Sequence, residues 1–171
     1  MKITDKLFNP AKKAYDSWAP FILRVIVGLG FLIHGQAKLS KGPAGFMALL
    51  QHLGIPQPKI MAWIAICTEV LGGIALITGA FVSIVSVPLI ITMLTAMFTI
   101  HYKFGYSSIK TIGLDANGPK FGPPGYEINL LYIAALGMLI AVGAGKFSLD
   151  SLFAKKTKDI GPVNKELHAA I

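Results

Sequence analysis

The sequence is poor in charge. Only 14% of its 171 residues are Asp, Glu, Lys or Arg, whereas 54% are hydrophobic, and the mean hydropathy is +0.63. A soluble domain of this length has about a quarter of its residues charged, so these few charges cannot cover a water-soluble globule. The composition excludes an ordinary soluble protein and predicts that much of the chain is dissolved in lipid.

Cysteine is nearly absent as well. Cys67 is the single cysteine, which excludes an intrachain disulfide, a CxxC redox pair and a cysteine-rich metal site. The motifs of soluble cofactor enzymes, such as GxGxxG after a strand, HExxH and GxSxG, are also missing. We therefore expect no intrinsic cofactor and no metal site, and the sequence assigns no catalytic residue.

The charge that is present is mostly basic. The net charge is +8, but the lysines lie in tails and loops without interleaved aromatic residues, which favours anionic lipid headgroups as partners and disfavours nucleic acid. Four lysines and two aspartates fall within residues 1–18. Such a polar stretch cannot form the apolar core of a cleavable signal peptide, so we expect none.

Long apolar runs predict an all-α membrane protein in which residues 20–144 form a bundle of four transmembrane helices. The predicted spans cover about residues 20–39, 59–78, 81–102 and 126–144. Each is close to the ~20 residues that cross a bilayer. Between the first two spans, GFMALLQHLG reads as a short interfacial helix with Phe46, Leu49 and Leu50 on one side. Residues 105–125 form a long Gly- and Pro-rich loop, a kind that is usually functional or disordered.

The flanking segments fix the predicted orientation. Residues 1–19 and the amphipathic, basic tail 145–171 lie on the same side if the number of spans is even, and Ser148 or Asp150 could cap a short helix in the tail. Nine lysines fall on that side and six on the other. The positive-inside rule then places both termini in the cytoplasm.

The first span carries an unusual polar face. Arg24, Gly28, Phe31, Gly35 and Lys38 recur at steps of three and four residues and therefore share one side of a helix. Glycines let a neighbouring helix approach closely. A guanidinium facing lipid costs several kcal/mol, so this face should point into the bundle, unless Arg24 snorkels to the interface.

The second span has a matching face with Glu69, Gly72 and Gly73. A carboxylate in mid-membrane must be paired or protonated, and Arg24 is the only arginine in the chain. We expect Arg24 and Glu69 to form an intramembrane pair on facing helices. The alternative is a protonated Glu69 that bonds to hydroxyl or backbone groups.

A second polar group gathers near the outer ends of the spans and is a candidate ligand or proton site. Its members are His34, Lys38, His101, Glu127 and Asn129. Histidine and carboxylate together can carry protons or hydrogen-bond a quinone carbonyl, although each residue could merely anchor a helix at the headgroups.

Other residues near this group have simpler interpretations. His52 is read as an interfacial anchor. Ligation of a haem by His34 and His101 is disfavoured, because the two residues lie at different depths. Tyr106 and the aromatic residues of the long loop could cover the mouth of a cavity or belong to the interfacial aromatic belt.

These motifs together resemble the DoxX-like family of bacterial integral membrane proteins. The resemblance rests on Arg24-x3-Gly28-x2-Phe31-x3-Gly35-x2-Lys38, on Glu69-x2-Gly72-Gly73-x2-Leu76-x2-Gly79, and on GYEINLLY followed by GAGKFSLD. It implies a multi-pass protein of the bacterial cytoplasmic (inner) membrane. Relatives of this kind form a subunit of a thiosulfate:quinone oxidoreductase or associate with redox and oxidative-stress partners.

Three functions remain open at this point. The first is a quinone-interacting subunit of a membrane oxidoreductase, or a partner to one, in which a quinone binds between helices and a partner protein supplies the electrons. The second is a non-catalytic scaffold or assembly subunit, acting as a homo-oligomer or with a redox protein. The third is a small-solute transporter, which four helices alone would hardly accommodate.

Overall fold

The structure, a computed structural model, describes residues 12–145 and 147–153. Its elements in chain order are α2 (Lys12–Ser40), α3 (Pro43–His52), α4 (Pro58–Thr78), α5 (Val82–Ala96), the π-helical turn η1 (Met97–His101), the 3-10 turn η2 (Tyr102–Phe104), β1 (Thr111–Asp115), β2 (Gly118–Phe121) and α6 (Glu127–Val142). Residues 1–11 of the predicted N-terminal segment and 154–171 of the predicted tail lie outside the described residues.

Three helices of the described part of the chain are long and apolar enough to cross a membrane. They cover Trp18–Ser40, Pro58–Thr78 and Val82–Phe104, the last of which joins α5, η1 and η2. The fourth apolar helix, α6, is shorter, with 16 residues. The protein is therefore a mostly helical membrane protein, and α2 begins at Lys12, ahead of the predicted start of the first span.

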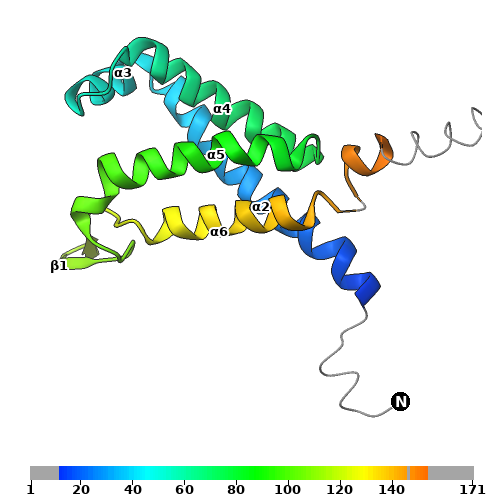
Figure 1. Ribbon diagram of the computed structural model, residues 1–171. Helices are drawn as coiled ribbons and strands as arrows, with labels where there is room; N and C mark the ends of the chain where they lie inside the picture. Colours follow the sequence, from blue (N-terminus) through cyan, green and yellow to red (C-terminus); the bar gives the residue numbers. More distant parts are fainter. Residues whose placement is uncertain (1–11, 146, 154–171) are drawn as a thin grey trace, which may run out of the picture.

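The helices associate in pairs. α2 packs most extensively against α4, and α5 packs against α6, while α4–α5 and α2–α6 contacts join the two pairs. Figure 1 shows α5 and α6 side by side, with α2 crossing them obliquely and α3 at one end of the molecule. A buried core that includes Val27, Phe31, Leu76, Leu89 and Leu136 connects the four helices.

Glycines bring α2 and α4 into backbone contact. A Cβ atom on Gly73 would lie 2.7 Å from the carbonyl oxygen of Gly28, and one on Gly28 would lie 2.8 Å from that of Gly73. Gly35 is equally close to α4, where its Cβ would lie 2.7 Å from Val70 Cγ2. Gly72 faces the other neighbour, because its Cβ would meet the Leu89 side chain of α5 at 3.0 Å.

The long loop contains a β-hairpin that the sequence analysis did not predict. β1 and β2 pair antiparallel, with Asp115 opposite Gly118, and the turn is stabilised by a 2.8 Å bond from the Asn117 N–H to the Asp115 carboxylate. The Asn117-Gly118 dipeptide is a known hairpin signal. The all-α description holds for the bundle but not for this loop.

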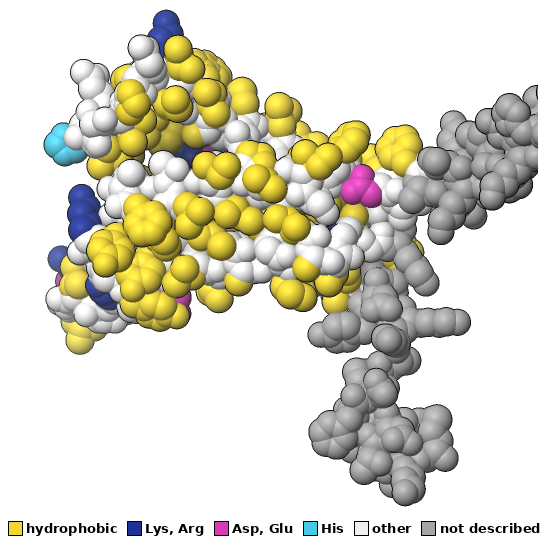
Figure 2. All heavy atoms as spheres, in the orientation of Figure 1, with side chains coloured by type: hydrophobic (Ala, Val, Ile, Leu, Met, Phe, Trp, Pro, Cys, Tyr) yellow, Lys and Arg dark blue, Asp and Glu magenta, His cyan; other side chains and the backbone are white. Residues whose placement is uncertain are grey.

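The outer surface matches a lipid environment. Figure 2 shows hydrophobic side chains spread over the face formed by α5 and α6, while most of the basic and histidine side chains in view gather at the end where β1 lies. Large apolar side chains such as Ile26, Leu71 and Ile84 are each more than 60% exposed. In water such a surface would aggregate, whereas in a bilayer it is the expected one.

Candidate functional site

Arg24 is buried in the bundle but does not pair with Glu69, so that prediction is wrong. Its guanidinium donates to the carbonyl oxygen of Leu76 at 3.0 Å and also to those of Ile77 and Phe147. The last turn of a helix leaves carbonyl groups without partners and carries a partial negative charge. Arg24 therefore caps the C-terminal end of α4.

Asp150, which follows α6 in the chain, caps the start of the next helix, α5. Its carboxylate accepts hydrogen bonds from the backbone N–H groups of Phe81 at 2.7 Å and Val82 at 3.0 Å, at the start of α5. Ser148, rather than Asp150, caps the helical turn 149–153, because its hydroxyl accepts from the Ser151 N–H at 3.1 Å. The cation at the end of α4 and the anion at the start of α5 both match the helix dipoles. We call Arg24, Asp150 and the backbone groups that they bind the α4–α5 clamp.

Glu69 instead pairs with Lys38, the other basic residue of the α2 face. The Lys38 ammonium binds both carboxylate oxygens, with 2.5 Å to Oε2, and the side chains are 24% and 3% exposed. The same ammonium lies 4.6 Å from the centre of the Phe46 ring on α3. Lys38 therefore joins α2, α3 and α4 at one point, and Glu69 is satisfied as a paired carboxylate.

The Lys38–Glu69 pair lies in the wall of a cavity of about 580 Å³, which we call the outer cavity. α2, α3, α4, α5, η1 and α6 all contribute to its wall, and Figure 2 shows the molecule hollowed at this end, between α3 and α5. The lining is mainly apolar and includes Phe31, Leu50 and Ile64. A volume of this size falls within the range of small-molecule sites.

His101 is held in the wall of the outer cavity by the loop. Its Nδ1 lies 3.0 Å from the carbonyl oxygen of Pro124. Because a carbonyl only accepts, Nδ1 is the donor in this hydrogen bond. η1 is a π-helical turn, a feature that is frequent at functional sites, and it sets the position of this ring on the third span.

Asn129 is also brought to the outer cavity. It is buried, and its amide Nδ2 donates to the Met93 carbonyl oxygen at 3.4 Å, whereas Oδ1 has no hydrogen-bond partner among the described residues. An unsatisfied buried acceptor costs about 1–3 kcal/mol. Asn129 is therefore a buried residue beside the cavity whose Oδ1 makes no hydrogen bond within the part of the chain that the structure describes.

Glu127 does not join this group. Its carboxylate accepts from the Ser108 N–H at 3.0 Å and so fastens the start of the long loop to α6, and it is not part of the cavity wall. His34 does line the cavity and is exposed, while His52 is exposed and does not line it. Of the predicted outer group, the structure brings together His34, Lys38, His101 and Asn129.

Several cavity residues were missed by the sequence analysis. Thr92, Thr95 and Thr99 line one side of the cavity from α5 and η1, and their spacing of three and four residues was a visible signal for a shared helix face. Tyr132 of α6 forms an edge-to-face pair with Phe31, with ring centres 5.2 Å apart. Both rings line the outer cavity and also pack in the buried core.

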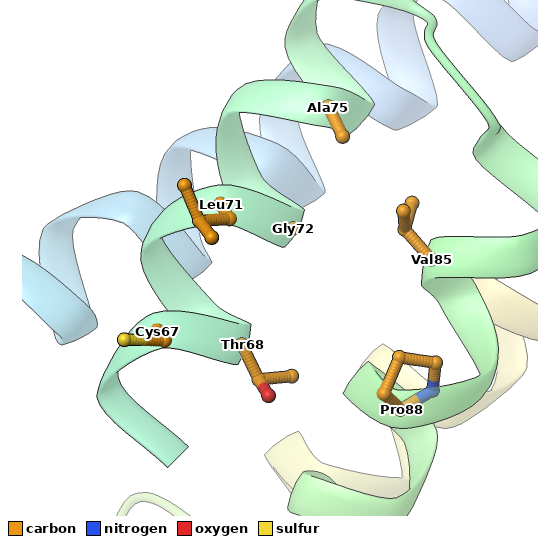
Figure 3. Close-up of a pocket in the computed structure, with 7 residues that line it drawn as sticks. All are labelled: Cys67, Thr68, Leu71, Gly72, Ala75, Val85 and Pro88. Atoms are coloured by element: carbon orange, nitrogen blue, oxygen red, sulfur yellow. The ribbon is translucent and has the colours of Figure 1, made fainter. Parts of the chain in front are cut away.

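A second hollow lies between α4 and α5 and has a volume of about 340 Å³. Figure 3 shows Thr68 and Gly72 of α4 facing Val85 and Pro88 of α5 across it, whereas the Cys67 side chain points away from α5. This groove is lined almost entirely by apolar groups. Binding in water-excluded sites needs a few well-placed polar groups for orientation, so the outer cavity is the better candidate site.

Comparison with known proteins places the chain in a family. The DoxX family model matches residues 19–102. "Inner membrane protein YphA" of Escherichia coli is 31% identical over 131 residues, which cover 75% of this chain and 86% of YphA. A Haemophilus influenzae protein is 30% identical over 146 residues, covering 82% of this chain and 97% of that protein.

A further relative is matched over a shorter stretch. The Bacillus subtilis protein named "Putative oxidoreductase CatD" is 32% identical over 82 residues, which cover 48% of this chain and 59% of CatD. No solved structure matches the chain. The family model together with the nearly full-length match to YphA confirms the resemblance: the chain belongs to the DoxX family of membrane proteins.

Proposed function

We propose that the chain is a quinone-interacting subunit of, or partner to, a membrane oxidoreductase, and that the quinone ring binds in the outer cavity. The observation that carries this proposal is the composition of the cavity wall: a mainly apolar lining interrupted by Lys38–Glu69, His101 and Asn129. A lipid-soluble ring needs apolar walls for its body and a few polar groups at its oxygen atoms.

The polar groups supply the chemistry that such a ring requires. Reduction or oxidation of a quinone moves protons as well as electrons, and histidine is the side chain that most often serves as a general acid or base in such transfers. The Lys38–Glu69 pair offers further hydrogen-bonding groups in the same wall. His101 is the residue that we propose to contact a ring oxygen.

Electrons would have to come from a partner protein. The sequence contains no flavin- or metal-binding motif, and the relative CatD carries an oxidoreductase name. The proposed role is therefore the membrane half of a redox system, with the soluble half supplied by another chain. Membrane lipids and a redox-protein partner, or a second copy of this chain, are the proposed partners.

We propose further that all four apolar helices cross the bacterial inner membrane and that both termini are cytoplasmic. The support comes from the α4–α5 clamp: the Asp150 N–H donates to the Gly79 carbonyl oxygen at 3.0 Å. The described residues that follow α6 therefore reach the end of the bundle where α4 meets α5, although α6 itself has only 16 residues.

The quinone proposal is tested by extraction in mild detergent and mass spectrometry of the lipid-soluble molecules retained by the full-length protein. We expect quinone to copurify with the wild type and to be lost from His101→Ala. The matched control is Thr78→Val, since the Thr78 hydroxyl bonds to the Ile74 carbonyl oxygen far from the cavity. A folded wild-type protein that retains no quinone, and binds none when it is added, contradicts the proposal.

The topology is tested with single cysteines introduced into the Cys67→Ser background. An impermeant thiol reagent applied to intact cells should label Ala116→Cys, in the hairpin turn, and should label Thr78→Cys only after lysis. Reversed labelling would place the termini outside. Labelling of a cysteine at position 149 from the outside would mean that α6 does not cross.

A scaffold role is the second candidate, and the hairpin favours it. Ile112, Leu114 and Phe121 are 67%, 80% and 60% exposed on β1 and β2, at the end of the bundle, where a partner protein could cover them. If this role is the main one, Leu114→Ser should abolish copurification of the partner protein but leave quinone retention unchanged. Loss of both together would favour the redox role.

A further inference from the structure

The hollow between α4 and α5 adjoins the outer cavity, and we call it the tail groove. We infer that the two form one binding path, in which the hydrocarbon tail of a quinone lies in the tail groove while the ring of the same molecule occupies the outer cavity. This inference rests on the proposed function and adds to it the class of ligand: a quinone that carries a long apolar tail.

The walls of the two hollows meet on both helices. On α4, Thr68 lines the tail groove, and the next residue, Glu69, lines the outer cavity. On α5, Pro88 lines the groove, and its carbonyl oxygen accepts a 3.0 Å hydrogen bond from the hydroxyl of Thr92, which lines the cavity. Figure 1 shows α4 and α5 close together at the turn that joins them and farther apart toward α3. The groove therefore lies at the narrow end of the opening between these helices, and the outer cavity lies at its wide end.

The other contacts between helices leave no comparable space beside the cavity in the part of the chain that the structure describes. α2 and α4 touch closely, because a Cβ atom on Gly35 would lie 2.7 Å from Val70 Cγ2. α2 and α6 touch as well, because a Cβ atom on Gly30 would overlap the Tyr132 hydroxyl. α5 packs extensively against α6. Among these four helix pairs, α4 and α5 are the pair with a hollow that continues the outer cavity along the bundle.

The distribution of polar groups along this path matches a ligand with a polar ring and an apolar tail. Charged and polar side chains lie in the wall of the outer cavity, whereas the tail groove is lined almost entirely by apolar groups. A tail that left the cavity toward the headgroups would enter water, which is unfavourable for every methylene group. The groove instead leads to the lipid-facing side of α4, where Leu71 is 64% exposed. A tail can therefore pass from the cavity into the bilayer without contacting water.

The fixed walls of the groove should hold a tail more tightly than fluid lipid does. Because lipid is as apolar as the groove, the gain comes from dispersion contacts, which are individually small but numerous. Thr68 and Ala75 mark the length of the groove on α4, and the seven positions between them correspond to about 10 Å along the helix axis. We expect a tail to raise the affinity of the ring, after correction for partition into lipid, about tenfold, which corresponds to about 1.4 kcal/mol.

The first experiment measures binding to the full-length protein in nanodiscs, with empty nanodiscs to correct for partition. The ligands are tetramethylbenzoquinone and its analogue in which a decyl chain replaces one methyl group. Thr68→Phe should lower the affinity for the decyl analogue to that of the tailless ring, because the Thr68 side chain faces Pro88 across the groove (Figure 3). The matched control is Cys67→Phe, since the neighbouring Cys67 side chain points away from α5. If Thr68→Phe does not fold, Ala75→Phe fills the groove farther from the cavity.

The second experiment identifies what occupies the groove. A quinone whose tail ends in a photoreactive diazirine should label α4 and α5 beside the groove, and an excess of the decyl analogue should remove this label. A phospholipid with a diazirine in its acyl chain reports on ordinary lipid.

Three results would overturn the inference alone. They are equal corrected affinities for the tailless and decyl ligands in the wild type, groove labelling by the phospholipid that the decyl analogue does not reduce, and a groove that neither probe labels, as when a second copy of the chain covers it. Absence of binding by both quinones would overturn the proposed function as well.

Discussion

The Lys38–Glu69 pair gives the sharpest test of the folded bundle. Glu69 is almost completely buried and Lys38 is three-quarters buried, and they bind each other through both carboxylate oxygens. Removing one partner of a buried pair costs about 3–5 kcal/mol, because the remaining charge is left unpaired. The two single substitutions should not cost the same amount, since the two partners differ in access to water.

Lys38→Met leaves an almost completely buried carboxylate without its partner, whereas Glu69→Gln leaves a flexible ammonium that can turn toward the headgroups. We therefore expect Lys38→Met to lower the free energy of unfolding by about 3 kcal/mol and Glu69→Gln by about 2 kcal/mol. The double variant has no charge to leave unpaired. Its loss of unfolding free energy should be about 2 kcal/mol smaller than the sum of the two single losses. This difference is the coupling energy of the double-mutant cycle.

The measurement is reversible denaturant unfolding of the protein in lipid micelles, followed by circular dichroism. A cycle through Arg24→Gln and Glu69→Gln serves as control. Arg24 and Lys38 are 14 positions apart on one helix, about 21 Å along its axis, so these two effects should add to within about 0.5 kcal/mol. Additive losses for Lys38 and Glu69, or strong coupling of Arg24 to Glu69, would refute the arrangement described here.

Three further comparisons between variants follow from the packing. Asp150→Asn should lower stability by about 1 kcal/mol through the loss of a charged cap, and the same unfolding assay should show a larger loss for Arg24→Gln, which leaves several carbonyl groups unsatisfied. Gly73→Ala should prevent α2–α4 packing. Its matched control is Gly137→Ala, whose Cβ would have nothing within 4 Å and which should stabilise α6 by about 0.5 kcal/mol. Similar unfolding curves for the two variants would contradict the close contact between α2 and α4. Gly125→Ala should weaken ligand binding in the outer cavity. Its Cβ would lie 2.1 Å from the Gly105 carbonyl oxygen, so the loop would shift and Pro124 would move away from His101. Unchanged ligand binding, or an equal loss of binding in the control Gly113→Ala, would count against this.

The sequence was informative where the physics is local. The length of an apolar run and the spacing of Gly28, Gly35 and Lys38 along one helix depend only on helix geometry, and the structure places these residues on the side of α2 that meets α4. The hairpin also has a local signal in the Asn117-Gly118 dipeptide, which is typical of a tight turn between paired strands.

The partners of the two buried charges could not be predicted in the same way, because they depend on the register of α2 against α4. α3 and two turns separate these helices in the chain, so no short connection fixes their relative height. Gly28 lies against Gly73, and this contact sets Arg24 beside the end of α4 and Lys38 beside Glu69.

The two ends of the bundle are held by different forces, and this difference accounts for the position of the cavity. Lipid tails are as apolar as the helix surfaces, so apolar side chains gain little free energy by moving from lipid into a helix interface. Helices in a membrane therefore associate through close packing and polar contacts. At one end, the Gly28–Gly73 contact joins α2 to α4, and the α4–α5 clamp ties the start of α5 and the segment after α6 to the same place. At the other end Lys38–Glu69 holds α2 to α4, while the loop fixes His101 beside Pro124. Because no hydrophobic collapse closes the space between these two attachments, a cavity can persist there, with its polar groups fixed before any ligand arrives.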